Sequence, residues 1–216
     1  MRAVLIAAKQ LALAKTRLIP ALPTVSERSA LAEAMFRDVL SAALSARTPE
    51  RVTVVTCDPV LMMLARNTGA GVINEGYPRG LNVAVKLATD QLMRSGATSI
   101  CTMLSDTPGV TGEDVDATFA AMPAGEGGVV LVPSRDFSGT NMIVRNPPEV
   151  IATQFGRFSL VRHLEDCREK NIACEVLRLQ RPALDLDLPA DLFEFARLPG
   201  ATHTQCHLAR LGLVHG

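Results

Sequence analysis

Short apolar runs alternate with longer amphipathic stretches along the first two thirds of the chain. Each run is almost continuously apolar, which is typical of strands that are buried on both faces of a parallel sheet. The predicted strands cover residues 3–8, 51–56, 99–104 and 128–133. We therefore expect a central sheet whose polar residues are confined to the strand ends.

The stretches between these runs have the spacing of amphipathic helices, and the first begins with Thr24 and Glu27, the pair that forms a capping box. The predicted helices cover residues 24–47, 59–70, 81–96 and 111–122. Strand, helix and strand in repeated order predict an α/β fold. The expected form is a single-domain, Rossmann-like, three-layer α/β/α arrangement with a mostly parallel central sheet.

The pattern becomes looser after residue 134. A helix is expected near residues 159–170, and the stretch ALDLDLPADL, residues 183–192, is interpreted as a strand. The last residues, 199–216, are weakly patterned, so we expect a surface tail after a domain that spans residues 1–198.

Two acidic residues, Asp185 and Asp187, interrupt the apolar stretch at residues 183–192. Residues two apart on a strand point to the same face. Burying one unpaired carboxylate costs several kcal/mol, and two adjacent carboxylates also repel each other. A cation between them would relieve both effects. The alternative is a strand end at which both acids are solvated.

Composition excludes several classes of protein. The 216 residues are 48% apolar and 20% charged, as in an ordinary globular protein, and 22 basic residues balance 22 acidic ones. Zero net charge, no Trp and one Tyr argue against nucleic-acid and membrane partners. Five cysteines without a C-x-x-C pair fit a reduced, cytoplasmic protein. No signal-peptide core is expected at the start, and no apolar stretch reaches the roughly 18 residues that span a bilayer.

A basic segment, KQLALAKTRL, follows the first predicted strand. Ligands of doubly wound sheets bind beyond the carboxyl ends of the strands, which is where Lys9, Lys15 and Arg17 are expected. Ammonium and guanidinium donors suit a polyphosphate. The segment contains no Gly, so it is neither a P-loop nor a dinucleotide fingerprint. The alternative is a solvated basic loop.

A third candidate acid, Asp106, follows the third predicted strand in the motif LSDTPG. Together with Asp185 and Asp187 it would place three carboxylates on neighbouring strand ends. Oxygen ligands that leave room for water and substrate phosphates suit Mg²⁺. A turn cap is the alternative role for Asp106.

Three further loops offer polar or glycine-rich groups. Gly80 would let the backbone approach a nucleotide base, and Asn82 is either a ligand contact or a helix N-cap. The SGTN motif, residues 138–141, suits an anion or sugar, or forms a hairpin turn. Gly156 and Ser159 lie at a helix entrance that would accept a carboxylate or phosphate, with Ser159 as a plain N-cap the alternative. His163 is interpreted as a packed or surface histidine.

The motifs KQLALAKTRL, GLN, SDTP, SGTN, FGRFS and LDLDLPADL occur in one order. In this ordered set the chain resembles the phospholactate guanylyltransferase family (CofC/FbiD type) of deazaflavin coenzyme biosynthesis, from residue 1 to about 197. The resemblance implies a nucleotidyltransferase-type fold. It also implies that Mg²⁺ is bound by Asp106, Asp185 and Asp187, the phosphorylated acid by Thr140, Gly156 and Ser159, and GTP by Lys9, Lys15, Arg17, Gly80 and Asn82. Lys15, Arg17 and Asp106 would be catalytic.

Two departures from the family pattern leave the choice of acid open. Ser105 and Thr107 flank Asp106, where the family more often has Ala and a bulky apolar residue. The first strand ends in Ala7, Ala8 and Lys9 instead of a PVK-like run. Neither change removes a charged residue.

The resemblance implies transfer of GMP from GTP to a small phosphorylated acid, with release of pyrophosphate, in coenzyme F-420 biosynthesis. The acid would be 2-phospho-L-lactate, phosphoenolpyruvate or 3-phospho-D-glycerate. A phosphate nucleophile is already ionised, which agrees with the lack of a convincing Ser/His/Asp or Cys/His set. The alternatives are a D-x-D glycosyltransferase, a molybdenum-cofactor guanylyltransferase and a non-catalytic GTP-sensing module. A homodimer is compatible with the sequence, although no residue pattern specifies one.

Overall fold

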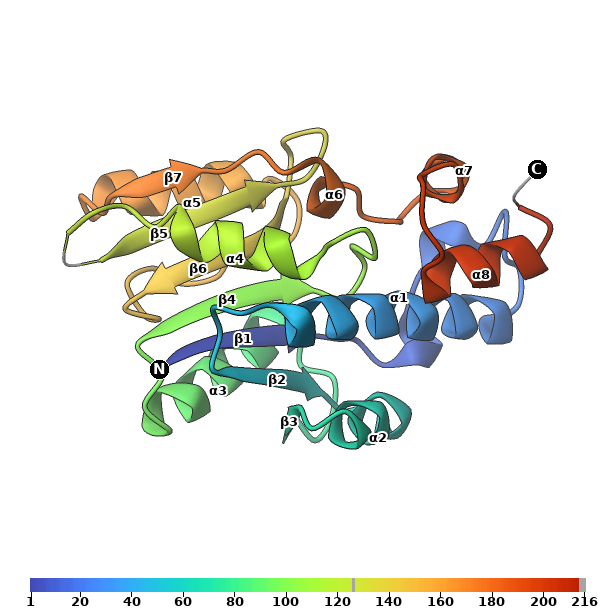
Figure 1. Cartoon of the computed structure of the whole chain (residues 1–216), viewed down its shortest axis with the longest axis horizontal. Helices are drawn as coiled ribbons and strands as arrows, with labels where there is room; N and C mark the ends of the chain where they lie inside the picture. The colour runs from blue at the N-terminus through green and yellow to red at the C-terminus, as the bar shows by residue number, and fades with distance from the viewer. Residues whose placement is uncertain (126, 214–216) are drawn as a thin grey trace.

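The computed structural model describes residues 1–125 and 127–213. The strands are β1 (Arg2–Ala7), β2 (Arg51–Thr56), β3 (Gly71–Asn74), β4 (Ser99–Leu104), β5 (Gly128–Pro133), β6 (Thr140–Asn146) and β7 (Cys174–Val176). They form one sheet in the order β3-β2-β1-β4-β6-β5-β7 (Figure 1). β6 is antiparallel to its neighbours β4 and β5, and the other described pairs are parallel.

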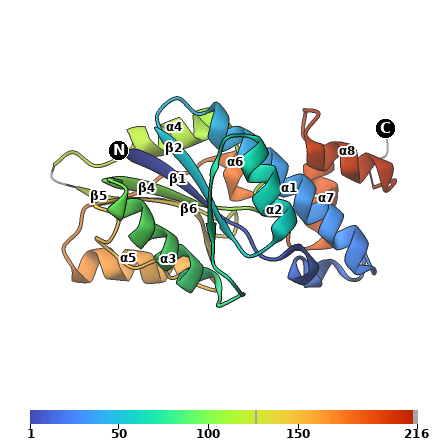
Figure 2. The same ribbon diagram turned by 90° about the horizontal axis from the view of Figure 1, so that it is seen from below.

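Helices cover both faces of this sheet. They are α1 (Val25–Ser45), α2 (Pro59–Asn67), α3 (Leu81–Arg94), α4 (Gly112–Ala120), α5 (Ser159–Glu169), α6 (Gln180–Ala183), α7 (Pro189–Ala196) and α8 (His203–Arg210), with short 3-10 turns η1 (Leu11–Leu13) and η2 (Thr16–Leu18). Figure 2 shows α1, α2 and α4 on one side of the sheet and α3 and α5 on the other. The predicted three-layer α/β/α fold is confirmed. Of the helices in the described ranges, none has both the length and the apolar character needed to cross a membrane.

The continuous apolar runs are explained by two separate cores, one on each side of the sheet. Ile6 of β1 packs into the core beneath α1, together with Met35 and Phe36. Leu5, its neighbour in sequence, packs into the opposite core with Val85 of α3. Because successive side chains of a strand point to opposite faces, a strand between two helix layers needs apolar residues at every position.

The predicted capping box at the start of α1 is confirmed. The Thr24 hydroxyl accepts from the Glu27 N–H (3.1 Å), and the Glu27 carboxylate accepts from the Thr24 N–H (2.9 Å). Thr111 and Asp114 form a second box at the start of α4. Each box satisfies backbone donors that a helix start otherwise leaves free, a contribution of about 1 kcal/mol.

The predicted strand at residues 183–192 is wrong. α6 ends at Ala183 and α7 begins at Pro189, and the residues between them are extended but lie outside the sheet. Leu186 is fully buried, and its N–H donates to the Asp106 carbonyl (3.1 Å). The apolar alternation therefore reflects burial of Leu184 and Leu186 in the core beneath α1, whereas Asp185 and Asp187 line the cleft.

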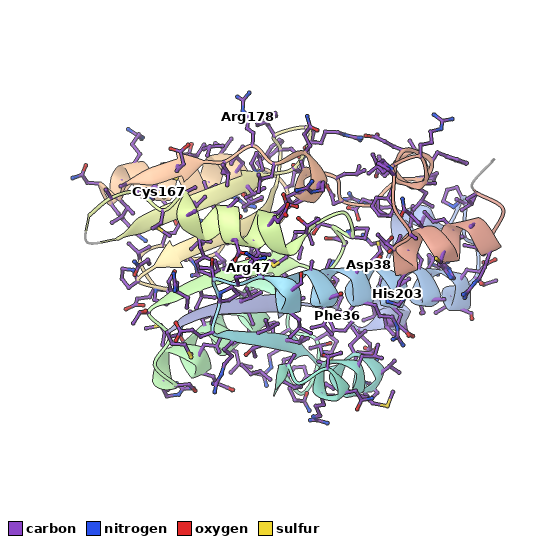
Figure 3. All side chains as sticks on the ribbon, viewed as in Figure 1. Phe36, Asp38, Arg47, Cys167, Arg178 and His203 are labelled. Carbon is purple, nitrogen blue, oxygen red and sulfur yellow. The ribbon has the colours of Figure 1, made fainter. Side chains whose placement is uncertain are left out.

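The prediction of a surface tail from residue 199 is wrong for its described part. α8 packs on α1 and buries Thr204 and Leu208 completely. The Asp38 carboxylate of α1 accepts hydrogen bonds from the N–H groups of His203 (2.8 Å) and Thr204 (2.9 Å) at the start of α8 (Figure 3). Residues 214–216 of this prediction lie outside the described residues.

Candidate active site

A cleft of about 880 Å³ lies beyond the carboxyl ends of β1 and β4. Its walls come from the basic segment after β1, the loop after β4, the β5–β6 turn, the start of α5 and the segment between α6 and α7. All the predicted site residues line it except Gly80 and Asn82. A smaller hollow of about 630 Å³, near the first residues of β2 and β3, contains none of them.

Lys15 is at the centre of the acidic side of this cleft. It has left-handed backbone angles (φ 55°) between η1 and η2, and its ammonium lies 3.1 Å from Asp106 Oδ2 and 2.9 Å from Asp187 Oδ1. Only 6% of its side chain is exposed. Burial alone would lower the pKa of Lys15, but the charges of Asp106 and Asp187 and the hydrogen bonds to both outweigh burial and raise it. Lys15 therefore remains cationic.

Asp187 is paired with basic side chains in this structure, and the assignment of Mg²⁺ to the acidic pair stays a prediction. Lys15 lies closest to Asp187, and Arg17, which is largely exposed, adds a longer contact of 3.4 Å. Burial would raise the pKa of Asp187, but the charges of Lys15, Arg17 and Lys9 and the Lys15 hydrogen bond lower it. The basic segment thus reaches the acids directly.

Asp185 makes no ion pair among the described residues and has only a 3.4 Å contact with the Asn141 amide. Burial, followed by the charges of Asp106 and Asp187, raises the pKa of Asp185. Asp106 Oδ1 is buried without a hydrogen-bond partner in the described part of the chain. The cluster therefore retains uncompensated negative charge and free oxygen acceptors.

This donor chemistry fits a divalent cation, since hard cations prefer carboxylate oxygens. As placed in residues 1–125 and 127–213, no three Asp, Glu, His or Cys side chains form a complete ligand set. Lys15 lies between two of the three candidate acids. An ion bound to Asp106 and Asp187 would therefore compete with the Lys15 ammonium for the same oxygens.

Two side chains whose roles were not predicted from the sequence, Asn141 of the SGTN motif and Asp191, hold the acidic segment in place. The Asn141 amide donates to the two carbonyls at the end of α6 (2.9 and 3.2 Å). The Asp191 carboxylate accepts the Asp187 N–H (3.1 Å) and is itself bound by Arg135 (3.1 Å). The role of Asp191 could have been predicted, because an acid at the third position of a helix that begins with Pro is a capping signal. The role of Asn141 could not, because its partners are about forty residues away along the chain.

Two hydroxyls belong to another part of the cleft lining. Thr140 opens β6 and Ser159 opens α5, both are almost fully buried, and Ser159 Oγ accepts from the Thr140 N–H (2.8 Å). Ser159 is not the N-cap of α5, because Phe158, in a left-handed conformation (φ 59°), has that position. Gly156 also has positive φ (120°), so the tight turn before α5 brings backbone and hydroxyls to one corner. The SGTN motif joins β5 to β6, as its hairpin-turn alternative predicts.

Gly80 and Asn82 lie outside this lining. Gly80 is the N-cap residue of α3, with φ 96°, so the N-cap interpretation of Asn82 is wrong. The Asn82 side chain instead accepts the Phe155 N–H (2.8 Å) and donates to the Phe155 carbonyl (3.1 Å). Asn82 therefore clamps the turn that leads to Gly156. The nucleotide-binding role of both residues stays a prediction.

Comparisons with known proteins agree with this geometry. The family described as guanylyl transferase CofC like matches residues 1–215. A phosphoenolpyruvate guanylyltransferase of Sphaerobacter thermophilus is 36% identical over 87% of this chain and 89% of its own length. A 3-phospho-D-glycerate guanylyltransferase of Phenylobacterium zucineum is 34% identical (88% of each chain). A 2-phospho-L-lactate guanylyltransferase of Methanothermobacter thermautotrophicus is 32% identical over 92% of this chain and 85% of its own length.

Among solved structures, a candidate nucleotide-diphospho-sugar transferase from Desulfovibrio desulfuricans G20 superposes with a TM-score of 0.74. It is 17% identical and covers 97% of this chain and 94% of its own. At that identity the likeness shows the fold, and it confirms the predicted nucleotidyltransferase-type architecture. The family match and the relatives confirm the predicted family. The chain belongs to the guanylyl transferase CofC-like family.

Proposed function

We propose that this protein transfers GMP from GTP to the phosphate of a small phosphorylated carboxylic acid and releases pyrophosphate. The observation that carries the proposal is the cleft itself, which is lined by a basic segment, three carboxylates and two buried hydroxyls. The names of the relatives support guanylyl transfer to such an acid. A place in coenzyme F-420 biosynthesis is consistent with it.

The reaction forms one bond and breaks one. A phosphate oxygen of the acid attacks the α-phosphorus of GTP, and the bond from that phosphorus to the oxygen of the β-phosphate breaks. The leaving pyrophosphate takes the electron pair. Since the attacking phosphate is ionised at neutral pH, the enzyme needs no general base. It must instead bring two anions together in line and cancel their charge.

The basic segment is suited to the triphosphate. Lys9, Lys15 and Arg17 line the same wall and would hold its oxygens and stabilise the charge that grows on pyrophosphate. Thr140, Ser159 and Gly156, which line the same cleft, would bind the acid acceptor. Different residues of one cleft would thus hold the two substrates.

Asp106, Asp185 and Asp187 would hold a divalent cation, which we propose is Mg²⁺. Bound there, the ion would supply charge neutralisation and Lewis acidity. The buried free oxygen of Asp106 and the unpaired charge of Asp185 support this assignment. Lys15 would then exchange its carboxylate partners for phosphate oxygens.

The test is pyrophosphate release from GTP and Mg²⁺, with phosphoenolpyruvate, 2-phospho-L-lactate and 3-phospho-D-glycerate added separately. Controls omit the acid, replace GTP with other nucleoside triphosphates, or supply a nucleotide sugar. Release that depends on one acid and on GTP supports the proposal, and Asp187→Asn should abolish it while leaving the fold intact. Release with no acid, or transfer from the nucleotide sugar alone, contradicts it.

A further inference from the structure

His163 of α5 is a fully buried histidine directly behind the hydroxyl corner. Its Nε2 accepts the backbone N–H of Gln154 (2.8 Å), and its Nδ1 lies 3.0 Å from Thr140 Oγ1. His163 is four residues after Ser159, so both side chains lie on the same face of α5. The imidazole is therefore wedged between a backbone donor and the Thr140 hydroxyl.

These contacts fix where the imidazole proton lies. Burial first, and then the positive charge of Arg145, lower the pKa of His163 to about 4, with Arg162 acting in the same direction and Asp166 against it. The ring is therefore neutral at pH 7 and carries one proton. Since Nε2 accepts from Gln154, that proton must be on Nδ1, which donates to Thr140 Oγ1.

The direction of this bond determines what Thr140 can offer to a ligand. Its oxygen already accepts from His163, and its hydroxyl hydrogen has no acceptor in residues 1–125 and 127–213. Ser159 is in the same condition, because its oxygen accepts from the Thr140 N–H and its hydrogen has no acceptor in that part of the chain. Both residues line the cleft. Two hydroxyls whose hydrogens are both free to donate match the oxygens of an anion.

We infer that His163 is a positioning residue that holds the Thr140 hydroxyl as a hydrogen-bond donor and so makes this corner specific for an oxyanion of the acceptor acid. The inference rests on the proposed function, in which Thr140 and Ser159 contact that acid. An acceptor that presented only a hydroxyl or amide hydrogen there would leave both free hydroxyl hydrogens without an acceptor, and would bind more weakly than an oxyanion.

Two substitutions of His163 separate positioning from structural support. In His163→Gln the side-chain oxygen can reach the Nε2 position and accept from Gln154, but no donor remains for Thr140. In His163→Asn the amide can donate to Thr140, but the Gln154 N–H is left unpaired. We expect His163→Gln to raise the KM for the acid roughly tenfold, the scale of one hydrogen bond to a charged group. The KM for GTP should stay within about twofold because, under the proposed function, GTP is held by the basic segment and not by Thr140.

His163→Asn should be the less stable protein but have the acid KM closer to wild type. If His163 only supported the fold, the less stable of the two variants would also have the higher KM for the acid. A double-mutant cycle adds the second criterion: in a Thr140→Val background, His163→Gln should change the acid KM little further, because the hydroxyl that it positions is gone. A wild-type acid KM in His163→Gln, or full additivity with Thr140→Val, overturns the inference.

The tautomer can be measured without turnover. ¹⁵N NMR of the histidine-labelled full chain at pH 7.5 should show a protonated Nδ1 and a bare Nε2 for the ring that disappears in His163→Gln. An Nε2–H tautomer or an imidazolium overturns the inference even if guanylyl transfer is normal. If no acid supports pyrophosphate release, the proposed function fails, and the NMR spectrum still decides whether His163 orients Thr140.

Discussion

The ion pair network around Lys15 predicts that Lys15→Met destabilises the metal-free protein. Methionine keeps an unbranched apolar stem of similar length, so the change removes mainly the ammonium. Asp106 would lose its ion-pair partner, and Asp187 would keep only the longer contact with the exposed Arg17, while Asp185 stays close to both acids.

The magnitude follows from burial. Removing one partner of a buried ion pair costs about 3–5 kcal/mol. Asp106 and Asp187 are 28% and 36% exposed, so solvent screens part of that effect, and we expect about 1–2 kcal/mol. For a chain of this size that lowers Tm by roughly 2–8 °C. Because the pKa of Lys15 is raised by folding, its contribution is complete below the ordinary lysine pKa and is lost only in alkali, so pH 7.5 measures it in full.

The assay is thermal unfolding in EDTA and then in increasing Mg²⁺. If the acids hold the cation, Mg²⁺ should stabilise Lys15→Met more than wild type, because no ammonium competes for the carboxylates and ligand-induced stabilisation grows with affinity. Lys86→Met is the matched control, since Lys86 is 75% exposed and pairs only with Asp90 on the same helix. Lys86→Met should change the free energy of unfolding by less than about 0.5 kcal/mol, and Mg²⁺ should stabilise this variant as much as it stabilises the wild type.

Each arm can refute a separate step. A wild-type Tm for Lys15→Met in EDTA would show that the buried contacts of Lys15 contribute nothing to stability. A lowered Tm with an unchanged Mg²⁺ response would show that the three aspartates do not share their oxygens between lysine and metal.

Three further predictions test other parts of the structure. Asp185→Asn should raise Tm in EDTA at pH 7.5 and abolish turnover, because it removes a charged group whose pKa is raised by burial and by the two neighbouring acids. The gain in Tm should shrink as the pH falls through that raised pKa. A constant gain between pH 7.5 and 4 would contradict the electrostatic reason. Asn82→Ala should raise the KM for the acid several-fold by releasing the Phe155 turn, roughly the effect of one lost hydrogen bond, and steady-state kinetics that show only a GTP effect would favour the nucleotide role instead. Asp38→Ala should cost about 1–2 kcal/mol in urea unfolding by uncapping α8, whereas Asp38→Asn should cost less, and equal losses would argue against capping.

The sequence predicted the parts of the fold whose physics is local. β2, β4 and β5 were recognised at their full lengths because a strand between two helix layers must be apolar at every position. β3 and β7 are short edge strands with exposed residues, so they have no such run. β6 was not predicted as a strand, because its first residues, Thr140 and Asn141, are polar and line the cleft.

The helix α8 shows where local reading fails. Thr202 and Gln205 form a capping box that local rules could have found, but the partner that fixes this helix, Asp38, is 165 residues away from His203 in sequence. Amphipathic spacing in so short a segment does not predict which surface it will cover. The tail prediction therefore failed because it missed a long-range contact, not because the segment lacks a helix signal.

The acidic cluster shows the same limit in its electrostatics. Local reasoning predicted a cation beside Asp185 and Asp187, because carboxylates out of water are costly unless they are neutralised. It could not establish which cation, since Lys15 lies 172 residues from Asp187 and 91 from Asp106. Under the proposed function the two answers would apply in turn. Lys15 would balance the acids before substrates bind, and a divalent ion held by the same carboxylates would leave the Lys15 ammonium free for the incoming triphosphate.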